Sequence, residues 1–231
     1  MQAIILVGGQ ATRLRPLTLT TPKALIDLQG KVILDHVLDL FKRYEVRDII
    51  MSVGYLKEQI MDYYSDGKKF DVTVSYIEET EPLGTAGPLH HVPSPLTETF
   101  IVCNGDELKE INIQEMLEFH RANGGWATLA LTRVADPSMY GVAKMSGNKI
   151  LEFVEKPKKE LAPSNLINAG FYIMEPQVVD MIPHGKAMFE FDVFPFLAKQ
   201  GKLFGYEFAG QWFDTGNFER LEKARQEWKG I

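Results

Sequence analysis

Two glycines, two arginines and a lysine lie close together near the start of the chain, directly after a short apolar run. Gly8 and Gly9 follow the run, Arg13 and Arg15 come next, and Lys23 follows a proline. Glycine lets the backbone approach a ligand closely, while guanidinium and ammonium groups bind phosphate. The stretch therefore predicts a phosphate-binding loop, unless it is an ordinary polar loop, and the rest of the chain has to decide.

The loop does not match the two most familiar phosphate-binding patterns. No lysine directly follows a glycine in it, so the G-x-x-x-x-G-K-[ST] pattern of the P-loop is absent. After Gly9 the next glycine is Gly30, which excludes the G-x-G-x-x-G fingerprint of dinucleotide-binding proteins. The site must therefore be identified from other parts of the chain.

Alternating strand and helix patterns surround this loop and indicate an α/β fold. Apolar, β-branched runs predict strands at 2–7, 48–53, 71–77, 99–103 and 126–132. Apolar residues at helical spacing predict helices at 32–44, 56–64, 112–122, 175–182, 190–199 and 217–228. Because strand–helix–strand units cross over right-handedly, we expect a Rossmann-like, mostly parallel sheet with helices on both faces.

The pattern changes in the second half of the chain, where residues 140–157 predict a β-hairpin that turns at Gly147 and Asn148. The hairpin would add a small β-rich excursion to the α/β fold. No repeat, low-complexity tract or linker-like stretch interrupts the sequence. Residues 1–231 are therefore expected to form a single domain.

The composition limits the classes of partner. A net charge of −6 gives no basic excess for nucleic acid, although a local group of cations can still bind one small polyanion. Cys103 is the only cysteine, so no intrachain disulfide can form. The first residues show no signal peptide or membrane span, and we expect a cytoplasmic location. A homo-oligomer is compatible with the composition.

Three polar clusters follow predicted strands. They are the opening loop, residues 104–107 after the strand at 99–103, and residues 155–157 at the end of the hairpin. Ligands of open α/β sheets bind outside the carboxyl ends of the strands. We therefore expect these three clusters to converge on one edge of the sheet and to form the site there.

Eight blocks, in order along nearly the whole chain, resemble the sugar-1-phosphate nucleotidyltransferases, most closely the catalytic domain of mannose-1-phosphate guanylyltransferases. The blocks read GGQATRLRPLT…TPK (8–23), EPLGTAGPL (81–89), NGD (104–106), YGV (140–142), FVEKPK (153–158), NLINAGFYI (165–173), FEFDVFP (189–195) and WFDTG (212–216). Such enzymes join a nucleoside triphosphate to a sugar 1-phosphate and release pyrophosphate. Many of them continue into a β-helix, for which 231 residues leave no room.

The resemblance implies a site that works by positioning and charge neutralisation. A sugar phosphate is already an oxyanion at neutral pH, so its attack on the α-phosphorus needs no general base. Asp106 and Asp214 are the implied ligands of Mg²⁺, which takes one or two carboxylates together with phosphate oxygens. The implied catalytic residues are Arg13, which would hold the β- and γ-phosphates, and Lys23, which would hold the α-phosphate. Lys156 would bind the phosphate of the sugar.

The resemblance also assigns the other contacts with the two substrates. The implied nucleotide-binding residues are Leu6, Gly8, Gly9, Thr12, Arg13, Glu79, Gly84, Thr85, Asn104 and Gly105. The implied sugar-phosphate-binding residues are Gly141, Glu155, Lys156 and Asn168. Glu155 and Asn168 would contact sugar hydroxyls. Ordinary structural roles remain open for three residues: Asp106 as a turn residue, Lys156 as a solvated strand end, and Glu190 as either a helix cap or a sugar ligand.

Three glutamates just before the G-T-A-G stretch bear on the identity of the base: Glu78, Glu79 and Glu81. A carboxylate can accept both donors on one edge of guanine, whereas uracil and thymine suit an amide better. The acidic run therefore favours guanine, with Glu79 as the best candidate, unless it is a solvated turn. Ala11 departs from the sequence of the family, which usually has glycine at this position, and alanine would be strained if the position needs a positive φ.

The leading interpretation is transfer from GTP to mannose 1-phosphate or a related hexose or heptose 1-phosphate. The alternative in the same class is a uridylyl- or thymidylyltransferase acting on glucose 1-phosphate or an amino sugar phosphate. The alternative from another class is a non-catalytic regulatory subunit that binds nucleotide-sugars. Loss of Arg13, Lys23, Asp106 or Asp214 would indicate such a subunit, and all four are present. The sequence therefore favours an enzyme.

Overall fold

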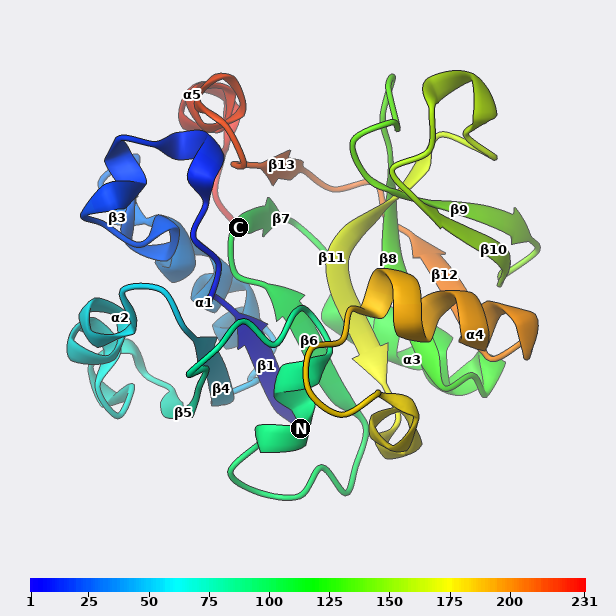
Figure 1. Ribbon diagram of the computed structural model, residues 1–231, viewed down its shortest axis with the longest axis horizontal. Coiled ribbons are helices and arrows are strands. Elements are labelled where there is room, and N and C mark those ends of the chain that lie inside the picture. Colours follow the sequence, from blue (N-terminus) through cyan, green and yellow to red (C-terminus); the bar gives the residue numbers. More distant parts are fainter.

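A twisted nine-stranded sheet forms the centre of the computed structural model, which describes residues 1–231 (Figure 1). The strands lie in the order β5-β4-β1-β6-β11-β8-β12-β10-β9. Their bounds are β1 (Gln2–Leu6), β4 (Asp48–Val53), β5 (Thr73–Glu78), β6 (Phe100–Asn104), β8 (Ala127–Arg133), β9 (Gly141–Ser146), β10 (Lys149–Glu155), β11 (Leu166–Met174) and β12 (Leu203–Glu207).

The half of the sheet from β5 to β6 is parallel, as the alternation of strands and helices predicts. β8 and β12 form a further parallel pair, whereas β11 runs antiparallel to both β6 and β8. The predicted hairpin is confirmed: β9 and β10 pair antiparallel, and Gly147 takes a φ of 56° in the turn between them. These findings confirm the α/β fold class and its β-rich second half.

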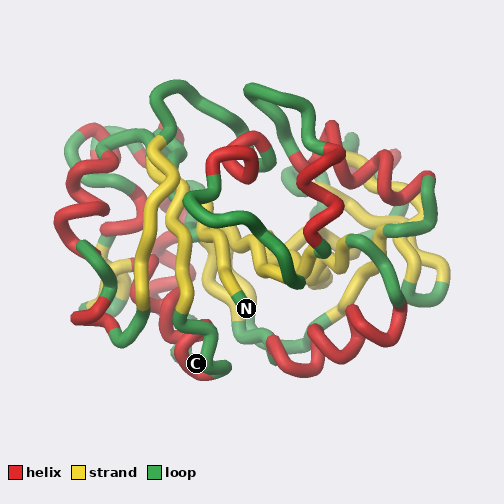
Figure 2. Tube along the Cα trace, turned by 90° about the horizontal axis from the view of Figure 1, so that it is seen from below, coloured by secondary structure: helices red, strands yellow, loops and turns green.

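Helices cover both faces of the sheet (Figure 2). Their bounds are α1 (Ile33–Arg43), α2 (Lys57–Tyr64), α3 (Ile113–Asn123), α4 (Phe194–Lys199) and α5 (Phe218–Glu227). Neighbouring side chains of β1 point to opposite faces of the sheet. Ile5 packs into the core with α1, and Ile4 packs into the core with α4. None of the helices combines the length and the apolar composition that a membrane span requires.

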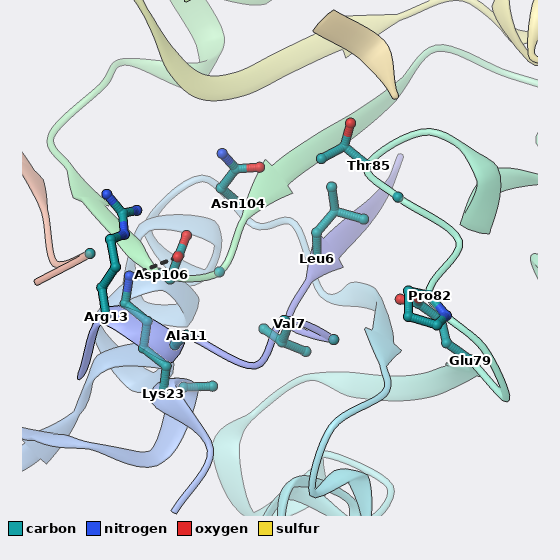
Figure 3. Close-up of a pocket in the computed structure, with 16 residues that line it drawn as sticks. Leu6, Val7, Ala11, Arg13, Lys23, Glu79, Pro82, Thr85, Asn104 and Asp106 are labelled. Atoms are coloured by element: carbon teal, nitrogen blue, oxygen red, sulfur yellow. Dashed lines mark hydrogen bonds and ion pairs between the residues drawn. The ribbon is translucent and has the colours of Figure 1, made fainter. Parts of the chain in front are cut away.

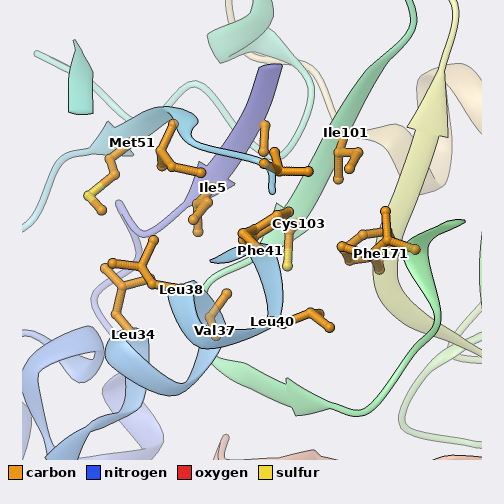
Figure 4. Close-up of a cluster of buried hydrophobic side chains, with 14 of the residues drawn as sticks. Ile5, Leu34, Val37, Leu38, Leu40, Phe41, Met51, Ile101, Cys103 and Phe171 are labelled. Carbon is orange, nitrogen blue, oxygen red and sulfur yellow. The ribbon is translucent and has the colours of Figure 1, made fainter. Parts of the chain in front are cut away.

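The apolar stripe of α1 fixes that helix on the sheet (Figure 4). Leu34, Val37 and Phe41 recur at helical spacing and are almost fully buried. The ring of Phe41 stacks on Phe171 of β11 with 5.9 Å between centroids, and Cys103 of β6 is buried in the same cluster. Cys103 therefore acts as a small core residue.

The helices predicted at 175–182 and 190–199 take other helical forms in the structure, and several strands were not predicted. Residues Pro176–Met181 form a 3₁₀-helix, and Phe189–Val193 form a π-helical turn before α4 begins. β11 was missed because it is buried on both faces and lacks alternation. Also missed were β12 and the short pairs β2 (Asp27–Leu28) with β3 (Lys31–Val32) and β7 (Glu107–Lys109) with β13 (Trp212–Asp214).

Strand register brings distant parts of the chain to one edge of the sheet. Leu6 at the end of β1 lies opposite Asn104 at the end of β6, so the loops that follow both strands begin side by side. The short β7–β13 pair then places Asp214 opposite Glu107. Three segments far apart in sequence therefore meet at this edge, and the sequence predicts the convergence of the first two, the loops after β1 and β6.

Candidate active site

Two adjoining cavities open at this edge of the sheet and share Arg13, Asn104 and Asp106. The first, which we call the glycine cavity, has a volume of about 370 Å³ and is also lined by Leu6, Val7, Gly8, Gly9, Ala11, Lys23, Ala24, Glu79, Pro82, Gly84, Thr85, Gly105 and Gly216. The second, the carboxylate cavity, has a volume of about 190 Å³ and is also lined by Glu107, Met139, Tyr140, Gly141, Glu155, Lys156, Asn168, Glu190, Asp214 and Arg220.

The structure thus brings together the predicted site residues, with the exception of Thr12. The predicted nucleotide-binding residues apart from Thr12 line the glycine cavity, and the predicted sugar-phosphate-binding residues line the carboxylate cavity. Thr12 is exposed, begins a short 3₁₀-helix and lines neither cavity. The turn at Ala11 directs the chain so that Arg13, and not Thr12, faces the site.

Two glycines are required by the walls of the glycine cavity. A Cβ atom on Gly8 would lie 2.6 Å from Oε1 of Glu79 and 3.3 Å from the backbone nitrogen of Gly54, so a larger residue would displace the Glu79 carboxylate from its place. Gly84 has a φ of 79°, and a Cβ atom there would lie 2.3 Å from the carbonyl oxygen of Ala187. The opening loop and the G-T-A-G stretch therefore form opposite walls of one cavity (Figure 3).

Of the three glutamates in the acidic run, only Glu79 lines the cavity. Its Oε1 accepts a hydrogen bond from Ser52 Oγ at 2.8 Å, and its Oε2 accepts one from the backbone N–H of Leu83 at 3.0 Å. Glu78 instead binds Lys57 at 2.9 Å, and Glu81 is exposed. Each oxygen of the Glu79 carboxylate keeps acceptor capacity, so the group is held in place and can still accept from a ligand.

Ala11 occupies the left-handed region, with φ 46° and ψ 49°. The conformation lets its carbonyl oxygen accept hydrogen bonds from Leu14 N and Thr18 Oγ1, both at 3.0 Å. A residue with a Cβ atom is strained in this region. The departure from the family's glycine therefore places an alanine where the backbone favours glycine.

Replacing Ala11 by glycine is expected to leave the free energy of unfolding unchanged or to raise it by up to about 1 kcal/mol, because relief of left-handed strain offsets the added chain entropy. Ala122→Gly, at an exposed site within α3, should instead lower it by about 1 kcal/mol. Urea denaturation of both variants measures the difference. A loss of stability in Ala11→Gly equal to that in Ala122→Gly would show that Ala11 is not strained.

Lys23 and Asp106 form an ion pair at the boundary of the two cavities (Figure 3). Their Nζ and Oδ2 atoms are 2.7 Å apart, and the Lys23 side chain is only 7% exposed. Burial raises the pKa of the Asp106 carboxyl, but the charge and hydrogen bond of Lys23 outweigh burial and hold that pKa below its usual range. Asp106 is therefore a carboxylate at neutral pH.

Arg13 faces both cavities and makes no hydrogen bond or ion pair within the protein. Its neighbour Arg15 points elsewhere, donating to Oε1 of Gln10 at 3.3 Å, and lines neither cavity. A guanidinium whose donors are unused beside a cavity is suited to bind an oxyanion. The structure thus separates the two arginines that the sequence places together.

Asp214, the second carboxylate that the resemblance assigns to the metal, lines the carboxylate cavity. Its Oδ1 accepts a hydrogen bond from the backbone N–H of Gly216 at 2.6 Å, and its Oδ2 pairs with Nη1 of Arg220. The hydroxyl of Tyr140 donates to the same Oδ2 at 3.4 Å. The structure contains no group of three or more histidine, cysteine, aspartate or glutamate side chains that could hold a metal ion by themselves.

The far wall of the carboxylate cavity carries the predicted sugar-binding residues. Oε1 of Glu155 forms an ion pair with Nζ of Lys156 at 2.8 Å, and the Lys156 side chain is 60% exposed. A Cβ atom on Gly141 would lie 2.8 Å from Oε2 of Glu155, so glycine makes room for that carboxylate. Asn168 donates to the hydroxyl of Tyr172 at 2.8 Å, which fixes its amide at the wall.

Three polar side chains of the carboxylate cavity were not assigned from the sequence, and one was left open. Glu107, Tyr140 and Arg220 had no motif that would place their side chains in the site, although Tyr140 lies in the Y-G-V block. Glu190, which the sequence left as a cap or a ligand, lies on the cavity wall. Its Oε2 accepts from Thr85 Oγ1 at 2.7 Å, which links the two cavities directly. Burial raises the pKa of the Glu190 carboxyl, against the opposing hydrogen bond of Thr85.

A Rossmann-like sheet whose edge carries a glycine-lined cavity, several cations and carboxylates is typical of proteins that bind phosphorylated nucleotides. The chain belongs to the nucleotidyl transferase family, whose model matches residues 2–229. The predicted resemblance is therefore confirmed.

Within this family, the chain is similar to curated mannose-1-phosphate guanylyltransferases. The chain is 40% identical over 223 residues to mannose-1-phosphate guanylyltransferase 1 of Arabidopsis thaliana and 39% identical over 223 residues to the mannose-1-phosphate guanyltransferase of Saccharomyces cerevisiae. Each match covers 94% of this chain and 61% of the relative. The chain thus spans about three-fifths of the length of these relatives.

Solved structures share the whole fold. A protein of Bacillus anthracis assigned as a glucose-1-phosphate thymidylyltransferase and solved with sucrose has a TM-score of 0.90 at 26% identity, covering 100% of this chain and 96% of that one. HddC of Yersinia pseudotuberculosis, solved with GMP-PN, has a TM-score of 0.81 at 27% identity, covering 99% of both chains. The first neighbour is assigned to thymidylyl transfer and the second was solved with GMP-PN, so their likeness does not select the base.

Proposed function

We propose that this domain transfers a guanylyl group from GTP to a sugar 1-phosphate, with mannose 1-phosphate as the expected acceptor, and releases pyrophosphate. The observation that carries the proposal is the adjoining pair of cavities, which share Arg13, Asn104 and Asp106. One cavity has the glycine walls that suit a nucleotide, and the other has the polar side chains that suit a sugar phosphate. The 40% identity to mannose-1-phosphate guanylyltransferases supports the choice of substrates.

In the proposed reaction, a phosphate oxygen of the sugar 1-phosphate attacks the α-phosphorus of the triphosphate. A new bond forms between that oxygen and the α-phosphorus, and the bond from the α-phosphorus to the bridging oxygen breaks, so pyrophosphate leaves with its electron pair. No proton has to move, and the protein's task is to bring two polyanions together. Lys23 and Arg13, at the boundary of the cavities, are placed to offset the charge.

The carboxylates of Asp106 and Asp214 fit a single hard divalent cation such as Mg²⁺. Asp106 and Asp214 both line the carboxylate cavity, and Mg²⁺ is commonly held by one or two carboxylates plus phosphate oxygens and water. A cation held there would supply further charge neutralisation for the phosphates. In the structure Lys23 binds one oxygen of Asp106, and Arg220 binds one oxygen of Asp214. When a divalent cation binds, the two side chains would share these oxygens with it or release them.

Glu79 is the proposed determinant of the base. Its fixed carboxylate can accept the N–H groups on the Watson–Crick edge of guanine, whereas it would face carbonyl oxygens of uracil or thymine. A hydrogen bond to a charged group contributes about 1.5–3 kcal/mol, so its loss with uracil or thymine corresponds to roughly tenfold to hundredfold discrimination. The other expectations, a cytoplasmic enzyme without nucleic-acid partners and compatible with a homo-oligomer, remain proposals.

Replacing Glu79 by glutamine is expected to reduce the preference for GTP over UTP and dTTP by roughly tenfold or more, because an amide no longer offers two acceptors. Glu78→Gln removes a charge one residue away and outside the cavity, and should leave the preference unchanged. The measurement is kcat/KM for each triphosphate at a fixed concentration of sugar phosphate. Equal preferences in wild type and Glu79→Gln would remove Glu79 as the determinant.

The proposed function itself is tested by incubating the protein with Mg²⁺, one triphosphate and one sugar 1-phosphate at a time and separating the products. GTP with mannose 1-phosphate should give GDP-mannose and pyrophosphate faster than any combination of UTP or dTTP with glucose 1-phosphate. A faster reaction with UTP or dTTP would replace the guanylyl assignment by the thymidylyl or uridylyl alternative.

A further inference from the structure

Arg220 is a cation of the carboxylate cavity that the proposed reaction leaves without a role. It lies in the first turn of α5, where its backbone N–H donates to the capping side chain of Asn217 at 2.9 Å. The N-terminus of a helix carries a partial positive charge, which disfavours a cation. The position of Arg220 is therefore not explained by the stability of α5.

The guanidinium of Arg220 is held in place but has donors to spare. Nη1 pairs with Oδ2 of Asp214, and the guanidinium carbon lies 5.1 Å from the centroid of the Tyr140 ring. The remaining N–H groups on Nε and Nη2 have no acceptor within the protein, and the side chain is 25% exposed. A guanidinium carries five N–H donors, so several are free to face the cavity.

The charges around the carboxylate cavity indicate a role for the free N–H donors of Arg220. Five carboxylate side chains line it against three cations, namely Arg13, Lys156 and Arg220. A phosphate monoester dianion would be repelled by such a wall unless cations contact it directly. Lys156 is already paired with Glu155, and the proposed reaction assigns Arg13 to the triphosphate. Arg220 is the remaining cation with free donors.

We propose that Arg220 binds the phosphate of the sugar 1-phosphate, together with Lys156, and so selects a phosphorylated sugar over a free sugar. This inference rests on the proposed function and adds a second ligand for the acceptor substrate. Asp214 and Tyr140 fix the plane of the guanidinium, which lets two parallel N–H groups meet two phosphate oxygens. Lysine has no planar fork and would not replace it fully.

The test uses Arg220→Gln and Arg220→Lys, with Lys223→Gln as the matched control. Lys223 is a largely exposed cation on the same helix, lies outside both cavities and pairs only with Glu227 at 3.9 Å. In titration calorimetry with mannose 1-phosphate, Arg220→Gln should raise the Kd roughly tenfold to a hundredfold, and Arg220→Lys should raise it less. The KM for GTP should change by no more than about twofold. The Kd for Mg²⁺ should not rise, because Arg220→Gln removes a cation that competes for Asp214, and Lys223→Gln should match wild type in every value.

The opposite pattern would overturn the inference. If the Kd for Mg²⁺ or the KM for GTP changes while the Kd for mannose 1-phosphate does not, Arg220 only positions Asp214. Circular dichroism would show whether Arg220→Gln disturbs α5. In that case Arg220→Lys tests the inference, because an unaltered Kd for mannose 1-phosphate in this folded variant also contradicts it. The proposed function fails separately: wild type would then form no nucleotide-sugar, while calorimetry still reports on the role of Arg220.

Discussion

Replacing Asp106 or Asp214 by asparagine is expected to lower kcat by roughly 10²–10³-fold while the fold is kept. Both carboxylates line the carboxylate cavity, Asp106 also lines the glycine cavity, and an amide cannot supply the negative charge that a divalent cation needs. Asparagine keeps the size of the side chain, so the β7–β13 pairing and the loop at Asp106 should persist. Steady-state kinetics measures kcat, and calorimetry with Mg²⁺ measures the loss of metal binding independently of activity.

Asp39→Asn is the matched control for these two variants. Asp39 is a carboxylate on α1 that pairs with Lys31 and Lys42 and lies outside both cavities, so its loss should leave kcat unchanged. Wild type should lose its activity in excess chelator and regain it when Mg²⁺ is restored. Full turnover of either site variant in excess chelator would contradict the proposed metal site.

Replacing Arg13 by alanine should raise the KM for the triphosphate and also lower kcat, for a combined loss of roughly 10²–10³-fold in kcat/KM. Its guanidinium has no partner within the protein, so the loss falls on the substrate and not on the fold. Lys156→Ala should instead raise mainly the KM for the sugar phosphate, because Lys156 lines only the carboxylate cavity. Initial rates with each substrate varied in turn measure these constants.

Arg15→Ala controls for the removal of a positive charge from the same loop. Arg15 is exposed, lines neither cavity and should therefore behave as wild type with both substrates. Equal effects of Arg13→Ala and Lys156→Ala on both substrates would show that the roles of the two cavities are wrongly divided. An effect of Arg15→Ala as large as that of Arg13→Ala would show a general charge effect in place of a specific contact.

The parallel half of the fold could be predicted because its strands and helices obey local rules. The apolar stripe on α1 and the short apolar runs of β1 and β4 are visible in a few consecutive residues. β11 could not be predicted in this way, since it is buried on both faces and contains Gly170 with a φ of 60°. Its pairing with β6 and β8 depends on residues far away in the sequence.

Site residues could be predicted where a motif follows directly on a strand. They could not be predicted where only tertiary contacts bring a side chain to the cavity. Gly8, Asn104 and Glu155 lie close behind strands or at their ends, and the ends of such strands converge at one edge of the sheet. Arg220 lies on a helix whose pattern carries no functional signal, and only the β7–β13 pairing brings Asp214 and then Arg220 to the cavity.

We propose that the two cavities bring a triphosphate and a sugar phosphate together for attack on the α-phosphorus. The most direct measurement follows radioactive phosphorus from GTP labelled at either the α or the γ position, in the presence of mannose 1-phosphate and Mg²⁺. We expect the α label in a nucleotide-sugar and the γ label in pyrophosphate. Transfer of the γ label to the sugar, or binding of both substrates without any movement of the α label, would contradict the claim.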